Sequence, residues 1–479
     1  MENGRIKLNK RKISLMVALF GGFCFLFVCF IIFGTGVLKG ISPEIDEERG
    51  KLISLENEKN TYEGSITDRW GMAITSTTQP GLRGEAADPE CFSYLIGYNS
   101  PVYGKSGLRS KYYSYLYNGG KDDYGAEMKL TVDAELQKKC YDLLAGYIGS
   151  VSVMNARTGE ILALAARSDP QVGYDINRID IADENGVRPF ETYNKINAFW
   201  YNRAVMAQDP PGSTFKIVTA ASMIENGIDD YTYEDEGFID VSGAKIWNFG
   251  KNEYGWCDLE KALNSSVNTY FASAGLKLGS RALIDTAQKY LIGAPIDLDF
   301  AQLTSKIDFS GLNNSYLIAS TAYGQGRLVV APLQLCMIIQ AVMNEGRMVH
   351  PYLVAQITDD GKTLYAPSFE GILSETIGPE NNARLKELLH SNGEYYGFDE
   401  YDYGYVIAKT GTAEVEYGAG NHVYIALAVD FGDNAYAICI DHADVSGATG
   451  FGLAEDAKTI LNALRSFNDI SAEKETENG

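Results

Sequence analysis

The sequence predicts a mixed α/β (α+β) domain in which helices flank an antiparallel sheet. Two pairs of short apolar runs joined by turns, at residues 151–164 and 423–440, are typical of antiparallel hairpins. Segments with helical apolar spacing lie between and after these hairpins, for example at residues 215–225. Strands and helices do not alternate regularly, which disfavours a parallel βαβ sheet. The 479 residues suffice for two or three domains with a substantial core.

The N-terminus has the pattern of a membrane anchor. Residues 1–12 contain five Lys or Arg and one acidic residue, and residues 13–38 contain no charge. As a helix, at about 1.5 Å per residue, the uncharged run outspans a hydrocarbon core of about 30 Å. The basic residues in front predict a cytoplasmic tail at 1–12, a transmembrane helix at 13–38 and export of everything beyond. The alternative is a cleaved signal peptide, but the run is long for one and no Ala-x-Ala-like cleavage site follows it.

Residues 39–145 are expected to form a stalk and a smaller N-terminal domain. The segment after the anchor is charged and helix-permissive, and a helix is predicted from Asp133 to Ala145. Many of the 31 tyrosines cluster at Tyr94–Tyr117 and Tyr395–Tyr405. We interpret both clusters as surface packing rather than a cofactor cage.

Residues 146–468 are expected to form the larger domain, which contains one hairpin near its start and a second one before its final helix. The first hairpin turns at Ala156-Arg-Thr-Gly159, where glycine supplies the positive φ of a tight turn. The second turns at Phe431-Gly-Asp-Asn434. A final helix is predicted from about Leu453 to Leu464, and the polar tail 469–479 is predicted to be disordered.

Composition excludes several classes of function. There are 63 acidic and 41 basic residues, and the net charge of −22 disfavours nucleic-acid binding. The four histidines are scattered and no Cys-x-x-Cys pair occurs, so a zinc site is not expected. No credible Gly-rich phosphate loop is present. The sequence therefore predicts no cofactor and no metal.

The segment Pro210-Pro-Gly-Ser-Thr-Phe-Lys216 carries the first chemical signal. Its Pro and Gly end the preceding segment and an apolar-periodic run follows, so Ser213 lies near a helix N-terminus with Lys216 one turn away on the same face. A lysine can take the proton of a serine hydroxyl if burial or another cation lowers its pKa. Backbone N–H groups at a helix start can stabilise an oxyanion. Taken alone the pair is weak, because a helix cap beside a solvated lysine has the same spacing.

Two further motifs strengthen this interpretation. Ser266-Val-Asn268 and then Lys409-Thr-Gly-Thr412 follow along the chain. Together the three motifs supply a nucleophile with its base, a second hydroxyl to relay a proton, and a strand-borne cation with hydroxyls that bind a carboxylate. These components describe acyl transfer from the C-terminus of a peptide.

In these motifs the chain resembles the class B penicillin-binding proteins, the monofunctional D,D-transpeptidases of peptidoglycan synthesis. Ser65-Ile-Thr-Asp-Arg69, Asn202-Arg-Ala204 and Tyr323-Gly-Gln-Gly326 are also similar to family segments, so the likeness covers nearly all of the exported part. The chain departs from the family at Arg109, where an acidic residue is expected, and over Asn421–Phe431.

The resemblance implies a penicillin-binding, serine-transpeptidase fold with a pedestal domain in front, and it assigns four catalytic residues. Ser213 would be the acyl-accepting nucleophile and Lys216 its general base. Ser266 would relay the proton, and Asn268 would hydrogen-bond the substrate amide.

The resemblance also assigns the substrate-binding strand. Lys409, Thr410, Gly411 and Thr412 would bind the terminal carboxylate. The backbone N–H groups of Ser213 and Thr412 would form the oxyanion hole.

The implied function is cross-linking of peptidoglycan stem peptides through a serine acyl-enzyme that β-lactams trap covalently. A D,D-carboxypeptidase side activity is compatible with this chemistry. The resemblance places the protein in the bacterial cell membrane, with a glycosyltransferase or other cell-wall assembly protein as its partner. Division, elongation and sporulation enzymes share these motifs.

Two alternatives remain open at this point. Glu260-Lys-Ala-Leu-Asn264 has the form of the motif that supplies a hydrolytic base in class A β-lactamases, but there the motif follows the Ser-x-Asn segment instead of preceding it. We interpret it as an ordinary helix with Leu263 packed inward. Class D β-lactamases and β-lactam sensors share two of the motifs but lack such a pedestal. The other alternative is a scaffold that has kept the fold and lost the activity.

Overall fold

The computed structural model describes residues 61–77, 83–118, 120, 123–169, 175–188, 201–308, 314–367, 371–399, 403–413, 421–445 and 449–478. Contacts divide the chain between Thr61 and Tyr62, and the described residues beyond Thr61 belong to one unit, Tyr62–Gly479. The predicted cytoplasmic tail and transmembrane helix lie outside the described residues. None of the helices in the described part is both long and apolar enough to cross a membrane.

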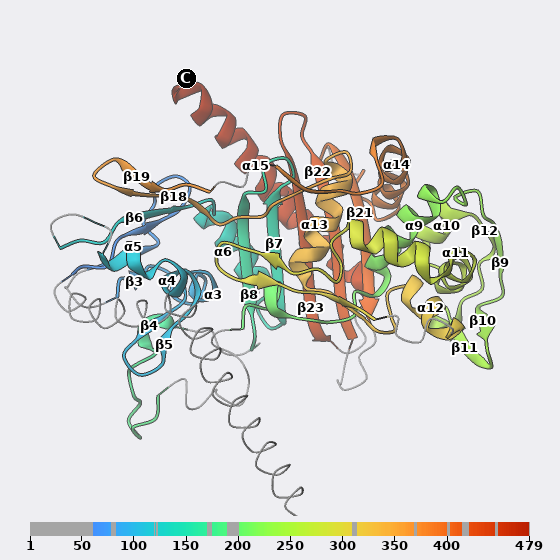
Figure 1. The fold of residues 1–479 in the computed structure, drawn as a ribbon, viewed down its shortest axis with the longest axis horizontal. Helices are drawn as coiled ribbons and strands as arrows, with labels where there is room; N and C mark the ends of the chain where they lie inside the picture. Colours follow the sequence, from blue (N-terminus) through green and yellow to red (C-terminus); the bar gives the residue numbers. More distant parts are fainter. Residues whose placement is uncertain are drawn as a thin grey trace, which may run out of the picture. The chain divides into compact units, whose positions relative to one another are not determined.

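A five-stranded sheet is built from residues within 148–167 and 405–445, and all its neighbouring strands are antiparallel (Figure 1). Its order is β21–β22–β23–β7–β8, so the two predicted hairpins lie side by side, and both are confirmed. The inner strands are buried on both faces, which explains why their sequences are nearly continuous apolar runs. The strands are β7 (Ile148–Asn155), β8 (Ile161–Arg167), β21 (Tyr405–Ala413), β22 (Asn421–Asp430) and β23 (Ala435–Val445).

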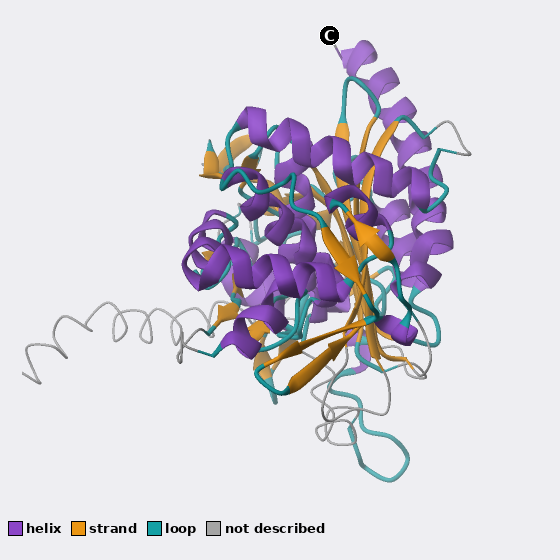
Figure 2. Cartoon of the chain, turned by 90° about the vertical axis from the view of Figure 1, so that its right-hand side faces the viewer, coloured by secondary structure: helices purple, strands orange, loops and turns teal. Residues whose placement is uncertain are grey.

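Helices cover both faces of this sheet (Figure 2). α13 (Pro332–Met343) packs on four of the five strands and is buried over its whole length, as its apolar sequence predicts. α15 (Ala454–Asn478) packs on β22, and α6 (Ala134–Leu143) packs on β7, β8 and α15. α6 begins where the sequence predicts it, because the Asp133 carboxylate accepts a hydrogen bond from the Leu136 N–H at 2.7 Å and caps the helix.

A group of helices beside the edge strand β21 carries most of the remaining predicted site. α14 contacts β21 directly, α9 contacts α11 and α14, and α10 contacts α14. Figure 1 shows this group at the β21 end of the sheet. Its members are α9 (Lys216–Glu225), α10 (Leu259–Asn264), α11 (Asn268–Lys289), α12 (Ser315–Ala322) and α14 (Pro379–Tyr395).

A second sheet combines strands that are far apart in the sequence. Its order is β1–β6–β18–β19, in which β1 and β6 are parallel and the other pairs antiparallel. Two of its strands precede the predicted domain boundary between residues 145 and 146, and the other two follow it. The sheet therefore depends on contacts between residues that are far apart in the sequence. The four strands are β1 (Ile66–Thr67), β6 (Glu127–Leu130), β18 (Val354–Asp359) and β19 (Lys362–Tyr365).

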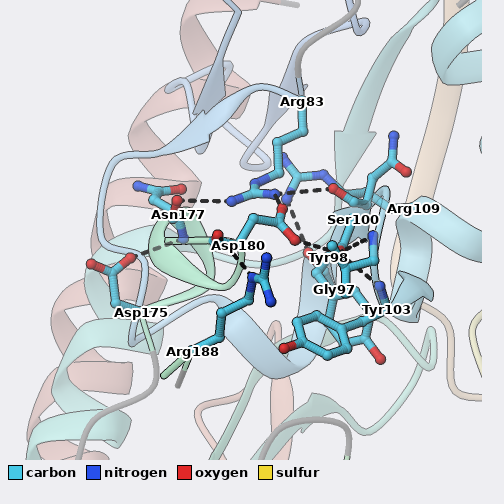
Figure 3. A network of polar contacts seen from close by, with 12 residues as sticks. Arg83, Gly97, Tyr98, Ser100, Tyr103, Arg109, Asp175, Asn177, Asp180 and Arg188 are labelled. Atoms are coloured by element: carbon cyan, nitrogen blue, oxygen red, sulfur yellow. Dashed lines mark hydrogen bonds and ion pairs between the residues drawn. The ribbon is translucent and has the colours of Figure 1, made fainter. Parts of the chain in front are cut away.

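Polar contacts connect Arg83 to residues 177–180, a segment that follows β8 (Figure 3). Arg83 donates to the Asp180 carboxylate at 2.8 Å and to Asn177 O at 2.8 Å. Arg109, the departure from the family pattern, is fully buried and pairs bidentately with Glu63 at 2.8 and 3.0 Å. The carboxylate of Glu63 therefore compensates the buried charge of Arg109.

The remaining elements are short. Cys91, Cys140, Cys257, Cys336 and Cys439 are buried and form no disulfide with one another. The short elements are β2 (Thr75–Ser76), β3 (Glu85–Ala86), α3 (Ser93–Ile96), β4 (Asn99–Ser100), β5 (Gly104–Lys105), α4 (Gly107–Lys111), α5 (Tyr113–Asn118), α8 (Arg203–Met206), β9 (Tyr233–Asp235), β10 (Phe238–Val241), β11 (Ala244–Trp247), β12 (Gly255–Cys257), β13 (Ile296–Asp297), β14 (Gln302–Leu303), β15 (Lys306–Ile307), β16 (Leu328–Val329), β17 (Arg347–Val349) and β20 (Ile372–Glu375).

The C-terminal helix is longer than the sequence analysis predicted. The disordered tail was expected to begin at residue 469, whereas α15 continues to Asn478. The sequence from Ala454 to Asn478 contains neither Gly nor Pro, and its last two turns are rich in Ala, Glu and Lys. These residue types favour helix propagation, so a polar composition alone was not a sufficient reason to expect disorder.

Candidate active site

The predicted nucleophile lies in a tight turn that neighbouring backbone holds in place. Ser213 is part of a 3₁₀ turn, Gly212–Phe215, that leads directly into α9. Gly212 has a φ of 54°, and a Cβ there would lie 2.6 Å from Thr412 O, so only glycine fits. The Gly212 N–H donates to Gly324 O at 3.0 Å. The turn is thus packed against β21, and Ser213 is left partly exposed.

Lys216 is fully buried, and its Nζ has three polar contacts. It donates to Ser266 O at 2.7 Å and to Asn268 Oδ1 at 2.8 Å, and it lies 3.1 Å from Ser266 Oγ. Burial lowers the pKa of Lys216 well below its ordinary value, and the charge of Lys409 lowers it further. In the neutral amine, two N–H groups match the two carbonyl oxygens and the lone pair stays available for a proton. Lys216 therefore has the surroundings of a general base.

The two acceptors of Lys216 come from the connection between α10 and α11. Ser266 has a φ of 53°, a left-handed backbone conformation that is uncommon for a residue other than glycine. Asn268 is the first residue of α11, and its Nδ2 donates to Trp247 O at 3.1 Å. This hydrogen bond fixes the amide so that its oxygen is directed at Lys216. Backbone strain such as the left-handed conformation of Ser266 is concentrated at functional sites.

Lys409, which is fully buried on β21, contacts the same serine. Its Nζ lies 3.2 Å from Ser266 Oγ, 3.2 Å from Tyr396 Oη and 3.1 Å from Thr410 O. These three acceptors equal the number of N–H donors of an ammonium group. Ser266 Oγ therefore bridges the two lysines: it accepts from Lys409 and can donate its own hydrogen to the neutral Lys216.

The rest of the strand motif lies against the nucleophile turn. A Cβ at Gly411 would lie 2.9 Å from Pro211 O, so the strand and the turn touch backbone to backbone. Thr410 Oγ1 lies 2.8 Å from Tyr396 Oη. Thr412 is partly exposed, and its Oγ1 accepts a hydrogen bond from the Gly450 N–H at 3.1 Å.

The structure thus brings the predicted residues of all three motifs together. Hydrogen bonds join Lys216, Ser266, Asn268 and Lys409 directly, and backbone contacts join the nucleophile turn to β21. Within the described part of the chain, the Ser213 hydroxyl has no hydrogen-bond partner. The Ser213 oxygen is therefore available to a substrate, and Lys216 lies one helical turn further along the chain.

The region that carries this arrangement matches a known family. Residues 149–463 match the family described as the penicillin-binding protein transpeptidase domain. The chain belongs to this family. The resemblance inferred from the three motifs is therefore confirmed.

Individual relatives of this transpeptidase family agree with the assignment. The stage V sporulation protein D of Bacillus subtilis is 28% identical over 378 residues, which cover 72% of this chain and 54% of the relative. The peptidoglycan D,D-transpeptidase PbpA of Mycolicibacterium smegmatis is 25% identical over 420 residues, which cover 79% of this chain and 83% of the relative. The chain thus spans about half the length of the Bacillus protein and most of the mycobacterial one.

Solved structures have the same fold. Penicillin-binding protein A from M. tuberculosis, in its ceftriaxone acyl-enzyme complex, is similar with a TM-score of 0.74 at 22% identity, over 85% of this chain and 99% of that chain. The mixed α/β penicillin-binding transpeptidase fold that the sequence predicts is confirmed.

The structure adds a buried charge cluster that the sequence analysis did not find. Arg203 Nε donates to Asp441 at 2.7 Å, and its Nη2 donates to Asp209 at 2.5 Å. His422 Nδ1 lies 3.3 Å from the Asp209 carboxylate. Burial opposes the charge on Arg203, but the two carboxylates more than offset it and raise its pKa. Because Asp209 lies four residues before Ser213, this cluster fixes the approach to the nucleophile turn.

A signal for the cluster was present in the sequence. The Asn202-Arg-Ala204 segment was noted as a family feature, but no partner could be assigned to Arg203. Its partner Asp441 lies on β23, more than two hundred residues away, and ordinary strand sequence surrounds it.

Tyr396 is a second residue that the sequence analysis missed. The cluster Tyr395–Tyr405 was interpreted as surface packing, and Tyr395 is indeed 57% exposed. Tyr396, however, is only 5% exposed and contacts both Lys409 and Thr410. Adjacent tyrosines at the end of a helix point in different directions, and the sequence does not say which one faces inward.

The structure also places the segment that resembles a hydrolytic motif. Glu260 accepts a hydrogen bond from Ser391 Oγ at 2.7 Å, and Asn264 Nδ2 donates to the same hydroxyl at 3.1 Å. Leu263 is fully buried, as predicted. The segment forms α10, which packs on α14, and the Glu260 carboxylate is paired with Ser391 on that helix.

Proposed function

We propose that this protein is a peptidoglycan D,D-transpeptidase that cross-links stem peptides through an acyl-enzyme on Ser213. The observation that carries the proposal is the buried Lys216, with its lowered pKa and its lone pair next to the hydroxyl that Lys409 also contacts. This base lies one helical turn from the partly exposed Ser213.

In the acylation step, Ser213 Oγ attacks the carbonyl carbon of the penultimate D-Ala residue, and its proton passes to Lys216. The negative charge that develops on the carbonyl oxygen is stabilised by the backbone N–H groups of Ser213 and Thr412. The C–N bond then breaks, and the leaving D-Ala amine takes a proton that Ser266 relays from Lys216. Positioned acid–base groups contribute roughly 10²–10⁴ in rate and an oxyanion donor roughly 10²–10³.

In the transfer step, the amine of a second stem peptide attacks the ester carbonyl, and Lys216 takes up its proton. The C–O bond to Ser213 breaks, and the serine oxygen takes the proton back from Lys216, which restores the alcohol and the neutral base. Before acylation, Thr410 and Thr412 bind the terminal carboxylate of the donor next to the positive charge of Lys409. Gly411 lets the substrate backbone lie close to the strand, and Asn268 hydrogen-bonds the substrate amide. A β-lactam enters the same path, and its opened ring stays attached to Ser213 because no amine displaces it.

The test uses the full-length protein in detergent and a fluorescent penicillin. A label that survives denaturing electrophoresis, requires Ser213 and decays over hours supports the proposal. Ser213→Ala, whose fold is checked by circular dichroism, should take up no label. Rapid loss of the label with drug turnover indicates a hydrolase, and absence of labelling in the folded wild type indicates an inactive scaffold.

We further propose that the chain is anchored by residues 13–38, with residues 1–12 in the cytoplasm and the catalytic domain outside the membrane. The charge pattern supports this arrangement. Residues 39–145 would then be the stalk and pedestal, residues 146–468 the transpeptidase domain, and a glycosyltransferase or another cell-wall assembly protein the partner of the pedestal or the anchor. Alkaline phosphatase fused after residue 45 should be active, and a fusion after residue 10 inactive. The opposite pattern would refute the topology.

A further inference from the structure

Tyr396 is buried at the end of α14, where it faces the strand that binds the substrate carboxylate in the proposed reaction. It is the residue that follows the last residue of α14, and the helix packs along β21. Its Oη lies 3.2 Å from Lys409 Nζ, 2.8 Å from Thr410 Oγ1 and 3.5 Å from the Thr410 backbone nitrogen. No other described side chain contacts both of these strand residues through polar atoms.

The chemistry of lysine fixes the direction of one of these hydrogen bonds. A lysine ammonium has three N–H donors and no acceptor, so Tyr396 Oη accepts from Lys409. In the hydrogen bond between Tyr396 and Thr410, either hydroxyl can be the donor. In both cases the Thr410 hydroxyl is held at 2.8 Å from the phenol oxygen.

We infer that Tyr396 is a positioning residue that holds the Thr410 hydroxyl and the Lys409 ammonium group in place for the terminal carboxylate of the substrate. Its phenol oxygen contacts both groups at once. This inference rests on the proposed function, because it assigns the carboxylate to Thr410. Tyr396 touches neither the substrate nor the reacting atoms, and it acts through its two neighbours.

The electrostatics of the phenol agree with these contacts. Burial opposes ionisation of Tyr396, but the charge of Lys409 and the hydrogen bonds of Lys409 and Thr410 outweigh burial and lower its pKa. The phenol is therefore coupled electrostatically to both residues of the strand.

The test compares Tyr396→Phe with its exposed neighbour Tyr395→Phe as the matched control. Acylation of the full-length protein is followed by intact-protein mass spectrometry, with benzylpenicillin and with its carboxyl methyl ester. We expect Tyr396→Phe to slow acylation by benzylpenicillin about tenfold, the loss of one hydrogen bond to a charged group. Acylation by the ester should change less than about twofold, and Tyr395→Phe should change neither rate by more than that.

A double-mutant cycle isolates the coupling to Thr410. In the Thr410→Val background the hydroxyl is gone, so the further change Tyr396→Phe should cost little more for benzylpenicillin. Equal slowing of the acid and the ester, or full additivity with Thr410→Val, would overturn the inference, because a general loss of packing has that effect.

Two further variants guard against misfolding of Tyr396→Phe. 4-Aminophenylalanine at position 396 keeps a donor and an acceptor, and 4-methylphenylalanine has the same size without either. The amino variant should retain the preference for the acid over the ester, and the methyl variant should lose it. The same preference in both variants refutes the inference. A wild-type protein that benzylpenicillin does not acylate refutes the proposed function instead.

Discussion

Two buried clusters contain residues that precede and follow the nucleophile turn in the sequence. They differ in whether their positive charges are paired with carboxylates. Before the turn, Arg203 is paired with the carboxylates of Asp209 and Asp441. After it, Lys216 and Lys409 share the hydroxyl of Ser266, and no carboxylate in the described part of the chain forms an ion pair with either lysine. The first cluster is compensated and the second is not.

The difference explains what each cluster does. A compensated buried ion pair holds its partners in one geometry, and removal of either partner leaves an unpaired charge. Two neighbouring cations without a counter-ion cannot both stay charged easily, so one of them is driven toward the neutral form. Lys216 is that residue, since it is both buried and close to Lys409. The arginine cluster supplies rigidity and the lysine cluster supplies a base.

The largest expected effect concerns the base itself. In Lys216→Arg the charge is kept but cannot be given up, because a guanidinium stays protonated. We expect the rate of acylation by penicillin to fall by roughly 10²–10⁴, as much as in Lys216→Met. Single-turnover labelling measures this rate. An arginine variant that keeps more than a tenth of the activity would show that neutrality is not what the site requires.

The compensated cluster is expected to affect stability rather than chemistry. Asp441→Asn leaves Arg203 with one carboxylate and should lower the free energy of unfolding by about 1–3 kcal/mol. The half-exposed pair of Asp430 and Arg157 provides the control, and Asp430→Asn should cost about 0–1 kcal/mol. The midpoints of urea denaturation compare the two variants. Equal midpoints would contradict the contrast drawn between buried and exposed pairs.

The coupling between the two lysines can be read from a pH profile. Acylation requires neutral Lys216, so the rate rises as pH increases through the pKa of Lys216. The charge of Lys409 helps to hold this pKa below its ordinary value, so in Lys409→Gln the pKa rises and the ascending limb moves to higher pH. Stopped-flow labelling across pH, normalised to each plateau, measures the limb. Lys138→Gln, which changes an exposed lysine of α6, should leave it in place. An ascending limb that stays at the same pH would show that the charge of Lys409 does not influence the pKa of Lys216.

The smallest effect is expected at Glu260, outside both clusters. Its carboxylate accepts from Ser391, so Glu260→Gln should change the lifetime of the penicillin acyl-enzyme by less than about twofold. Loss of label from the purified acyl-enzyme measures this lifetime. A much longer lifetime would identify Glu260 as a base that activates water and would favour the hydrolase interpretation.

The sequence was sufficient wherever the determining interactions are local. Both sheet hairpins follow from apolar runs around turn residues such as Gly159, and the α6 start follows from the capping Asp133. The spacing of Ser213 and Lys216 places them one turn apart whatever the rest of the fold does. The order of the three motifs then identified the family.

Tertiary structure decided what depends on residues far apart in the chain. The sequence alone did not show that Ser266 bridges Lys216 and Lys409, that Arg203 meets Asp441, or that Tyr396 faces inward while Tyr395 faces solvent. Burial and the proximity of a second cation set the pKa of Lys216, and both arise only when α9, α11 and β21 pack together. The sequence by itself thus determined which chemical groups are present and in what order. The fold decided which of them share a low-dielectric interior, where a nearby charge acts strongly enough to turn a lysine into a base.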